Sequence, residues 1–144
     1  MWLIISTVIL AIFTAGTVQA VQLPEIAHGY IADDGEEKFI SSADTEAIVR
    51  SYFRDIPIMA EVARCESTFR HHLADGSVLQ GRVDPDDTGV MQINKRYHLE
   101  TAVAMELDLD DLYDNMAYAR NLYERQGVQP WSASMPCWGN SLAL

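Results

Sequence analysis

The chain has 144 residues, which is enough for one domain with a proper hydrophobic core, and its apolar residues show no division into two domains. Its formal net charge is -11, from 10 Lys and Arg against 21 Asp and Glu. A surface that binds nucleic acid needs clustered basic side chains, whereas here they are dispersed among twice as many acids. The composition therefore argues against nucleic acid as a partner.

Residues 1–20 contain no charged side chain and include an apolar run from Trp2 to Phe13. They end in Val18-Gln19-Ala20, a spacing that suits cleavage of a signal peptide. No Lys or Arg precedes the apolar run, so an uncleaved membrane anchor is the alternative. Either way we expect an exported protein, extracellular or held in the cell envelope.

Residues 21–43 hold Pro24, Gly29, Gly35 and an acidic cluster without sustained periodicity, and they predict an acidic tether. The folded domain is expected at 44–138, with a short tail at 139–144. Ser41 to Asp44 offer N-cap oxygens to a helix whose apolar face carries Ile48, Val49, Tyr52 and Phe53. Pro57 is expected to stop this helix and to begin the next one, which runs to Glu66.

The rest of the chain predicts a mostly α-helical fold with one irregular region. Residues 71–90 are rich in Gly, Pro and Asp and predict a small hairpin or an ordered loop. Helical periodicity returns at about 97–106, with Leu99, Ala102 and Val103 on one stripe, and again from Asp111 to a stop at Gly127. The segment 130–138 is short and turn-rich.

Glu66 lies where an ordinary amphipathic helix would carry an apolar residue. The residues three, four, seven and eight positions before it are all apolar and share its helix face: Ala63, Val62, Met59 and Ile58. A carboxyl group at the rim of an apolar core has a raised pKa, which keeps it able to donate a proton near neutral pH. The alternative is a glutamate whose head group reaches solvent past the helix end.

The sequence contains two cysteines, Cys65 and Cys137. An even cysteine count in an exported chain favours a disulfide, which here would hold the C-terminal segment against the helix that carries Glu66. Two unrelated buried thiols are the alternative.

Four blocks follow one another along the chain: Cys65-Glu66-Ser67-Thr68-Phe69, Gly89-Val90-Met91-Gln92-Ile93-Asn94, Asn115-Met116-Ala117-Tyr118-Ala119 with Leu122-Tyr123, and Trp131-Ser132-Ala133-Ser134. In order and spacing they resemble the blocks of the lysozyme-like superfamily, and most closely those of the soluble lytic transglycosylase (SLT) domains. The resemblance implies a helical two-lobed lysozyme fold with a glycan cleft, and cleavage of the bond between N-acetylmuramic acid and N-acetylglucosamine in peptidoglycan. It matches Glu66 to the catalytic acid of the family.

The same blocks supply candidate substrate-binding residues. The resemblance implies that Ser67 orients the acid or a sugar substituent; alternatively it is a residue at the helix end that faces water. Gly89 would allow the backbone to approach a sugar closely, and Gln92 and Asn94 are candidates for contacts to the substrate. Tyr118 is the candidate aromatic residue of the cleft, although aromatics at helical spacing also belong to a core.

Whether a second carboxylate takes part in catalysis distinguishes a hydrolytic mechanism from that of a lytic transglycosylase. Lytic transglycosylases typically use one glutamate, because a hydroxyl of the substrate closes an anhydro ring. The block from Asp87 to Asn94 also resembles that of animal-type lysozymes, in which an Asp two residues before the Gly assists hydrolysis. Asp87 is therefore a candidate second catalytic group or, alternatively, part of a solvated acidic turn.

We expect no cofactor and no metal, because His71, His72 and His98 lack metal-ligand spacing. The expected partner is the peptidoglycan glycan strand, and the expected state is a monomer. A non-catalytic glycan-binding module of the cell envelope is the alternative from another functional class.

Overall fold

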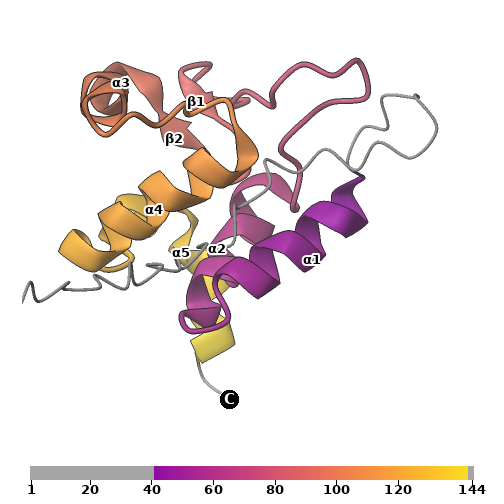
Figure 1. Cartoon of the computed structure of the whole chain (residues 1–144). Coiled ribbons are helices and arrows are strands. Elements are labelled where there is room, and N and C mark those ends of the chain that lie inside the picture. Colours follow the sequence, from indigo (N-terminus) through magenta and orange to yellow (C-terminus); the bar gives the residue numbers. More distant parts are fainter. Residues whose placement is uncertain (1–40, 143–144) are drawn as a thin grey trace, which may run out of the picture. The chain divides into compact units, whose positions relative to one another are not determined.

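The computed structural model describes residues 41–142, which form a mostly helical unit with one small sheet (Figure 1). The expected leader, residues 21–40 of the tether and residues 143–144 lie outside the described residues. The elements follow in the order α1 Ser42–Tyr52, α2 Pro57–Ser67, β1 Asp87–Thr88, β2 Ile93–Asn94, α3 Lys95–Ala104, α4 Leu112–Gln126, η1 Gln129–Ser134, α5 Met135–Trp138 and η2 Gly139–Leu142, where η marks a 3-10 helix. In Figure 1 the strands and α3 gather at one end of this unit, away from α1, α2 and α5.

A capping box begins α1. The Ser41 side chain accepts a hydrogen bond from the Asp44 backbone N–H, and the Asp44 carboxylate accepts one from the Ser41 backbone N–H. Residues 41–43 are thus part of the folded unit and not of the tether. The helix ends at Tyr52, before Pro57, because the chain turns at Phe53, whose carbonyl accepts from the Ile56 N–H.

Pro57 occupies the first turn of α2, as expected, since its missing N–H is not needed there. Met59, Val62 and Ala63 are fully buried, which confirms the apolar face that leads to Glu66. The helix ends at Ser67 because Thr68 and Phe69 both take positive φ angles, 55° and 57°. Left-handed backbone is unfavourable for such side chains, so the sharp turn directly after Glu66 is held by its surroundings.

The irregular region contains a narrow antiparallel ladder. Isolated bridges join His72 to Val78 and Gln80 to Thr88. The regular strand pair is β1 with β2, in which Asp87 faces Asn94 and Thr88 faces Ile93. The sheet therefore extends beyond the expected range 71–90, because β2 lies at Ile93–Asn94.

Helix α3 begins at Lys95, two residues before the expected start, because the Asn94 side chain caps it by accepting from the Arg96 N–H. The expected apolar stripe of α3 is wrong. Ala102 is buried, but Leu99 and Val103 are 47% and 64% exposed.

Helix α4 runs from its N-cap Asp111 to Gly127, as the sequence predicts. Its buried apolar residues Leu112, Met116, Ala119 and Leu122 belong to the hydrophobic core. Buried side chains of α1, α2, α3 and the C-terminal segment belong to the same core. Residues outside these helices also contribute to it: Phe53, Phe69, Val90, Met91, Ile93 and Leu109.

The predicted disulfide joins Cys65 of α2 to Cys137 of α5, with 6.0 Å between their Cα atoms. Trp131 and Trp138, which flank Ser134 in the sequence, are both buried. Residues 139–142 of the expected tail form η2, which packs against α2 and α5. Within residues 41–142, no helix has the length and apolar character needed to span a bilayer.

Candidate active site

A polar recess of about 170 Å³ opens beside the C-terminal end of α2. Side chains from α2, the two-stranded sheet, α3, α4 and η1 meet around it. Its lining comprises Glu66, Asp87, Gln92, Ile93, Asn94, His98, Leu122, Pro130, Trp131 and Ala133. Four of the residues singled out in the sequence, Glu66, Asp87, Gln92 and Asn94, are therefore brought together.

Glu66 is half-buried at the rim of the apolar core. Burial raises the pKa of its carboxyl group, a hydrogen bond from Ser134 lowers it, and the nearby charge of Asp87 raises it again. The net effect is a raised pKa, caused mainly by removal of the carboxylate from water. Glu66 thus has the environment of a proton donor that the helix pattern predicts.

The Glu66 carboxyl group has one hydrogen-bond partner among the described residues. The Ser134 hydroxyl lies 2.6 Å from Glu66 Oε1, and the Trp138 indole Nε1–H lies 2.9 Å from the Ser134 oxygen. The Trp138 indole N–H and the Ser134 hydroxyl each also lie 3.1 Å from the Trp131 carbonyl oxygen. One oxygen of the acid therefore contacts a serine of the C-terminal segment, and a tryptophan of the same segment contacts that serine.

Asp87 lies on β1 at the same recess. The Asn94 amide donates to Asp87 Oδ1 at 2.8 Å and to Asp84 Oδ2 at 3.0 Å. Burial raises the pKa of Asp87, the Asn94 hydrogen bond lowers it, and the charges of Asp84 and Asp86 raise it. Asn94 is occupied with these carboxylates and with capping α3, so its amide holds the acidic loop in place.

Gly89 has a different role from the expected approach to a sugar. Its φ is +72°, and a Cβ atom there would lie 2.6 Å from Asn115 Nδ2 and 2.7 Å from His71 Cε1. The glycine is required by packing against buried side chains. The Gln92 side chain turns back to donate from Nε2 to the Gly89 carbonyl at 2.9 Å while it lines the recess.

Two other sequence candidates lie inside the protein. Ser67 is buried, and its hydroxyl donates to the Ala63 carbonyl at 3.0 Å, so it neither faces water nor binds Glu66. Tyr118 is 1% exposed, and its hydroxyl lies 3.1 Å from His98 Nδ1. Its ring belongs to the core and is not offered to a sugar, whereas His98 lines the recess.

Ser134, Trp138 and His98 are the residues of this site that sequence reasoning missed. Ser134 belongs to a block of the resemblance and precedes Cys137 by three residues. Since the disulfide brings Cys137 next to Cys65, the neighbour of Glu66, the cysteine pairing already placed Ser134 close to the acid. That combination of spacing and pairing was the available signal.

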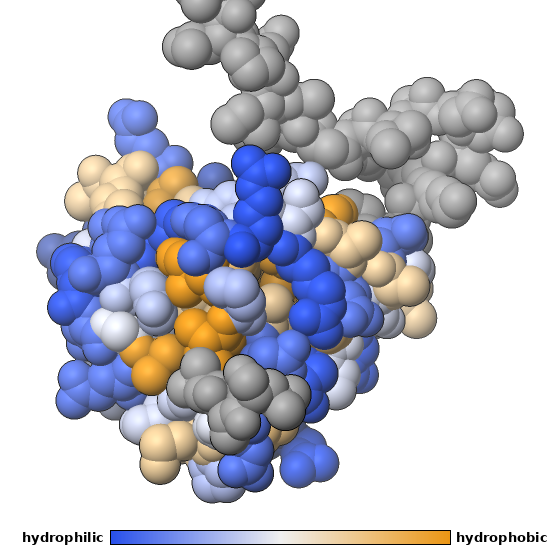
Figure 2. Space-filling model, turned by 90° about the horizontal axis from the view of Figure 1, so that it is seen from below, coloured by the Kyte–Doolittle hydropathy of each residue, from blue (hydrophilic) through white to orange (hydrophobic). Residues whose placement is uncertain are grey.

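A larger groove of about 1270 Å³ lies between the α1–α2 turn and the C-terminal segment. Figure 2 shows apolar residues gathered at the centre of the face seen from below, with hydrophilic residues around them; the α1–α2 turn lies at this end in Figure 1. The lining of the groove mixes apolar residues such as Ile56 and Ile58 with charged ones, including Glu61.

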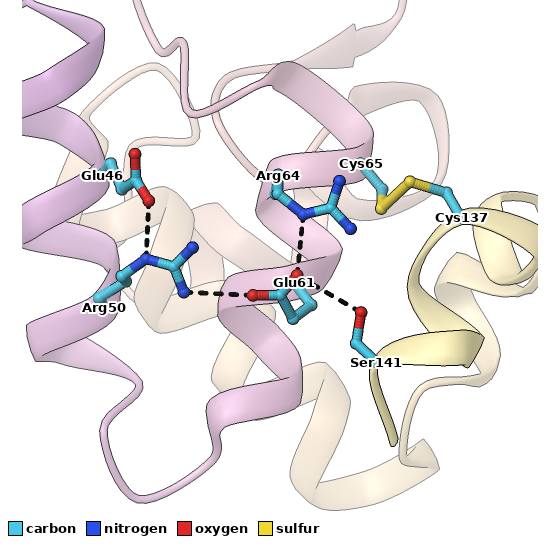
Figure 3. Close-up of polar contacts among 7 residues, drawn as sticks. All are labelled: Glu46, Arg50, Glu61, Arg64, Cys65, Cys137 and Ser141. Atoms are coloured by element: carbon cyan, nitrogen blue, oxygen red, sulfur yellow. Dashed lines mark hydrogen bonds and ion pairs between the residues drawn. A yellow bond between two sulfur atoms is a disulfide. The ribbon is translucent and has the colours of Figure 1, made fainter. Parts of the chain in front are cut away.

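The two acids that line that groove, Asp55 and Glu61, are both paired with arginines and are not suited to donate a proton. Glu61 accepts hydrogen bonds from Arg64 at 2.8 Å and from Arg50 at 3.2 Å, and Ser141 contacts it at 3.5 Å, as Figure 3 shows. These arginines, Arg64 foremost, lower the pKa of Glu61 and keep it ionised. The network ties α1, α2 and η2 together beside the disulfide, so the smaller recess around Glu66 is the better candidate for catalysis.

Among residues 41–142, no group of three or more His, Cys, Asp or Glu side chains is placed to hold a metal ion. No protein-family model, curated protein or solved structure matches the chain. The assignment of a function therefore depends on the resemblance and on the chemistry of the recess.

Proposed function

We propose that the chain is an exported, lysozyme-like enzyme that cleaves peptidoglycan glycan strands as a lytic transglycosylase, with Glu66 as its acid and base. The observation that carries the proposal is the half-buried Glu66 in a polar recess, with a pKa raised by burial. Among ligand sites the recess is small, since pockets usually measure about 300–1,000 Å³. It would hold the sugar atoms around the scissile bond, while the rest of the strand lies across the surface.

The reaction needs two proton transfers, one from Glu66 and one to it. Protonated Glu66 donates its proton to the glycosidic oxygen while the bond from that oxygen to the anomeric carbon breaks. A hydroxyl of the N-acetylmuramic acid then bonds to the anomeric carbon, and Glu66, now a carboxylate, takes the hydroxyl proton. The acid returns to its starting state, and no water is consumed.

Hydrolysis with Asp87 as a second carboxylate is the alternative, favoured by the position of Asp87 at the same recess. A hydrolytic partner acid acts as an anion, as nucleophile, base or stabiliser of the oxocarbenium centre. Burial raises the pKa of Asp87, and its Oδ1 already accepts a hydrogen bond from the Asn94 amide at 2.8 Å. We therefore put first the transglycosylase mechanism, which needs no second carboxylate. A module that only binds glycan has no need for a carboxyl group removed from water, as Glu66 is.

The test is cleavage of purified peptidoglycan by the full chain and by its Glu66→Gln variant. Loss of a general acid lowers the rate by about 100-fold or more, and we expect the variant to keep the circular dichroism spectrum of the wild type. Glu100→Gln is the matched control, because Glu100 is exposed on α3. Cleavage by a folded Glu66→Gln protein at the rate of the wild type would refute the proposal.

A further inference from the structure

The hydrogen bonds around Glu66 have a direction that is fixed by their donors. An indole N–H can only donate, so the contact between Trp138 Nε1 and Ser134 Oγ at 2.9 Å makes the serine oxygen the acceptor. The single hydroxyl proton of Ser134 then remains for a contact of its own. It can point to Glu66 Oε1 at 2.6 Å or to the Trp131 carbonyl at 3.1 Å.

The neighbouring contacts favour Glu66 Oε1 as the acceptor of the Ser134 hydroxyl proton. The Trp131 carbonyl shares the Trp138 indole N–H with Ser134, at 3.1 Å against 2.9 Å, so it has a donor besides the serine hydroxyl. A distance of 2.6 Å is typical of a charge-assisted hydrogen bond from a hydroxyl to a carboxylate. Within the described residues, Oε2 of Glu66 makes no hydrogen bond, so the two oxygens of the acid are not equivalent.

We infer that Ser134, oriented by Trp138, is a positioning residue that makes Glu66 Oε1 a permanent acceptor and reserves Oε2 for the proton that is transferred. This inference rests on the proposed function for its catalytic meaning. The proton on Oε2 goes to the glycosidic oxygen and stays there, and Oε2 then accepts a second proton from the attacking sugar hydroxyl. The Ser134 hydrogen bond strengthens while negative charge develops on the carboxylate, so it stabilises the transition state more than the bound substrate.

The disulfide places both ends of this hydrogen-bond chain. Cys65 is the neighbour of Glu66 on α2, and Cys137 is the neighbour of Trp138 on α5. The charged and titratable groups that face the acid from other elements are few. Asp87 on β1 and His98 on α3 line the recess with it, and only Asp87 acts on its pKa through charge.

The test compares Ser134→Ala with Ser134→Thr, which keeps the hydroxyl, in the full chain. Ser132→Ala is the matched control, because Ser132 is exposed on the same 3-10 helix. The readout is the titration of the Glu66 carboxyl carbon by ¹³C NMR, assigned with the Glu66→Gln variant, which requires no turnover. We expect a higher pKa of Glu66 in Ser134→Ala, and the wild-type pKa in Ser134→Thr and Ser132→Ala. An unchanged pKa in folded Ser134→Ala would overturn the inference.

Kinetics with peptidoglycan give the second readout. We expect Ser134→Ala to lower kcat by about tenfold with little change in KM, and to move the basic limb of its pH profile to higher pH. Equal losses in Ser134→Thr, or a loss confined to KM, would also overturn the inference. If the wild type cleaves no peptidoglycan, the proposed function fails, while the NMR titration still decides whether Ser134 controls Glu66.

Discussion

The carboxyl group of Glu66 is held away from water, and this placement opposes folding whenever the group is ionised. Its pKa in the folded protein is raised above the usual 4.5, mainly by burial. At neutral pH the unfolded chain ionises this group more easily, so the charge costs stability. Below the ordinary pKa both states are protonated and the cost disappears.

Glu66→Gln should therefore raise the melting temperature of the protein at pH 7 by a few degrees, since the amide keeps an acceptor for Ser134 and carries no charge. The gain should shrink as the pH falls through the raised pKa towards 4.5. Thermal unfolding followed by circular dichroism at pH 7 and pH 4 checks both statements. A variant less stable than the wild type at pH 7 would contradict this account of Glu66.

Gly89 offers a second test at the scale of one residue. Gly89→Ala forces a methyl group against Asn115 and His71 and keeps a positive φ, so we expect a loss of more than about 2 kcal/mol in unfolding free energy. Gly139→Ala is the control, because its φ is -62° and its nearest new contact, Met135 Cγ, lies at 3.4 Å. Urea unfolding of both variants measures the difference, and equal stabilities would exclude packing as the reason for Gly89.

The sequence predicts residues of the site where a local pattern carries the information. The spacing of Met59, Val62 and Ala63 places Glu66 at the core rim without any tertiary knowledge. The contact between Ser134 and Glu66 joins residues 68 positions apart, so no local period contains it. Ser134 was missed, whereas Tyr118 was predicted in the cleft and lies in the core. The helical spacing of a tyrosine is the same whether it faces the cleft or the core.

At the scale of elements, the disulfide connects the helix that carries the acid with the segment that carries Ser134. Cys65 and Cys137 are 72 residues apart, and the chain-entropy model gives about 4 kcal/mol for closing such a loop. Cys137 is exposed, so a reductant can reach the bond.

Reduction should lower the unfolding free energy by about that amount and loosen α5 from α2. Urea unfolding with and without a phosphine reductant measures the effect, and the Cys65→Ser/Cys137→Ser variant controls for the reductant itself. Two titratable thiols in the untreated native protein would show that the bond does not form.

Helix α3 shows that periodicity does not predict which face of a helix is buried. Leu99, Ala102 and Val103 share one stripe, and the pattern predicted that this stripe faces the core. Only Ala102 is buried, because the covering of a helix depends on which neighbours pack against it. The start of α3 was also missed, since Asn94 acts both in β2 and as the helix cap.

At the scale of the whole molecule, His71 ties the loop before α4 to the block that follows β1. It is 1% exposed, its Nε2 contacts the Asp110 carbonyl at 2.8 Å, and its Nδ1 accepts from the Val90 N–H at 3.1 Å. This pattern requires the neutral ring with its proton on Nε2. Burial lowers the pKa of His71 below its usual 6.5.

The unfolded chain therefore binds a proton at His71 before the folded protein does, and stability should fall as the pH drops from 7.5 to 5.5. The slope cannot exceed about 1.4 kcal/mol per pH unit for one proton. Urea unfolding of a Glu66→Gln/Asp87→Asn/His98→Gln variant separates this effect from its neighbours, because Glu66 and Asp87 act with the opposite sign and His98 with the same sign. Equal stability at the two pH values would contradict the role of His71.

The fold class was predictable from the sequence, whereas the contacts between distant segments were not. Capping residues, Pro57 and Gly127 mark helices in the sequence, so a mostly helical chain with an irregular middle followed from local rules. The network of Glu61, Arg50 and Ser141 and the packing of η2 depend on how distant segments meet. Local spacing accounts for much of the difference between the two acids, because Arg64 lies three residues after Glu61 and Glu66 follows an apolar helix face. The contacts of Arg50 with Glu61 and of Ser134 with Glu66 come from other segments of the chain, so local patterns do not contain them.

Mass spectrometry of the fragments that the full chain releases from peptidoglycan, with the Glu66→Gln variant alongside, decides between transglycosylase and hydrolase chemistry. We expect fragments one water lighter than hydrolysis products, each ending in an anhydro sugar, from the wild type alone. Fragments with reducing ends would contradict the single-glutamate mechanism and make Asp87 the next residue to replace. No fragments from a wild-type protein that still sediments with the cell wall would contradict catalysis itself.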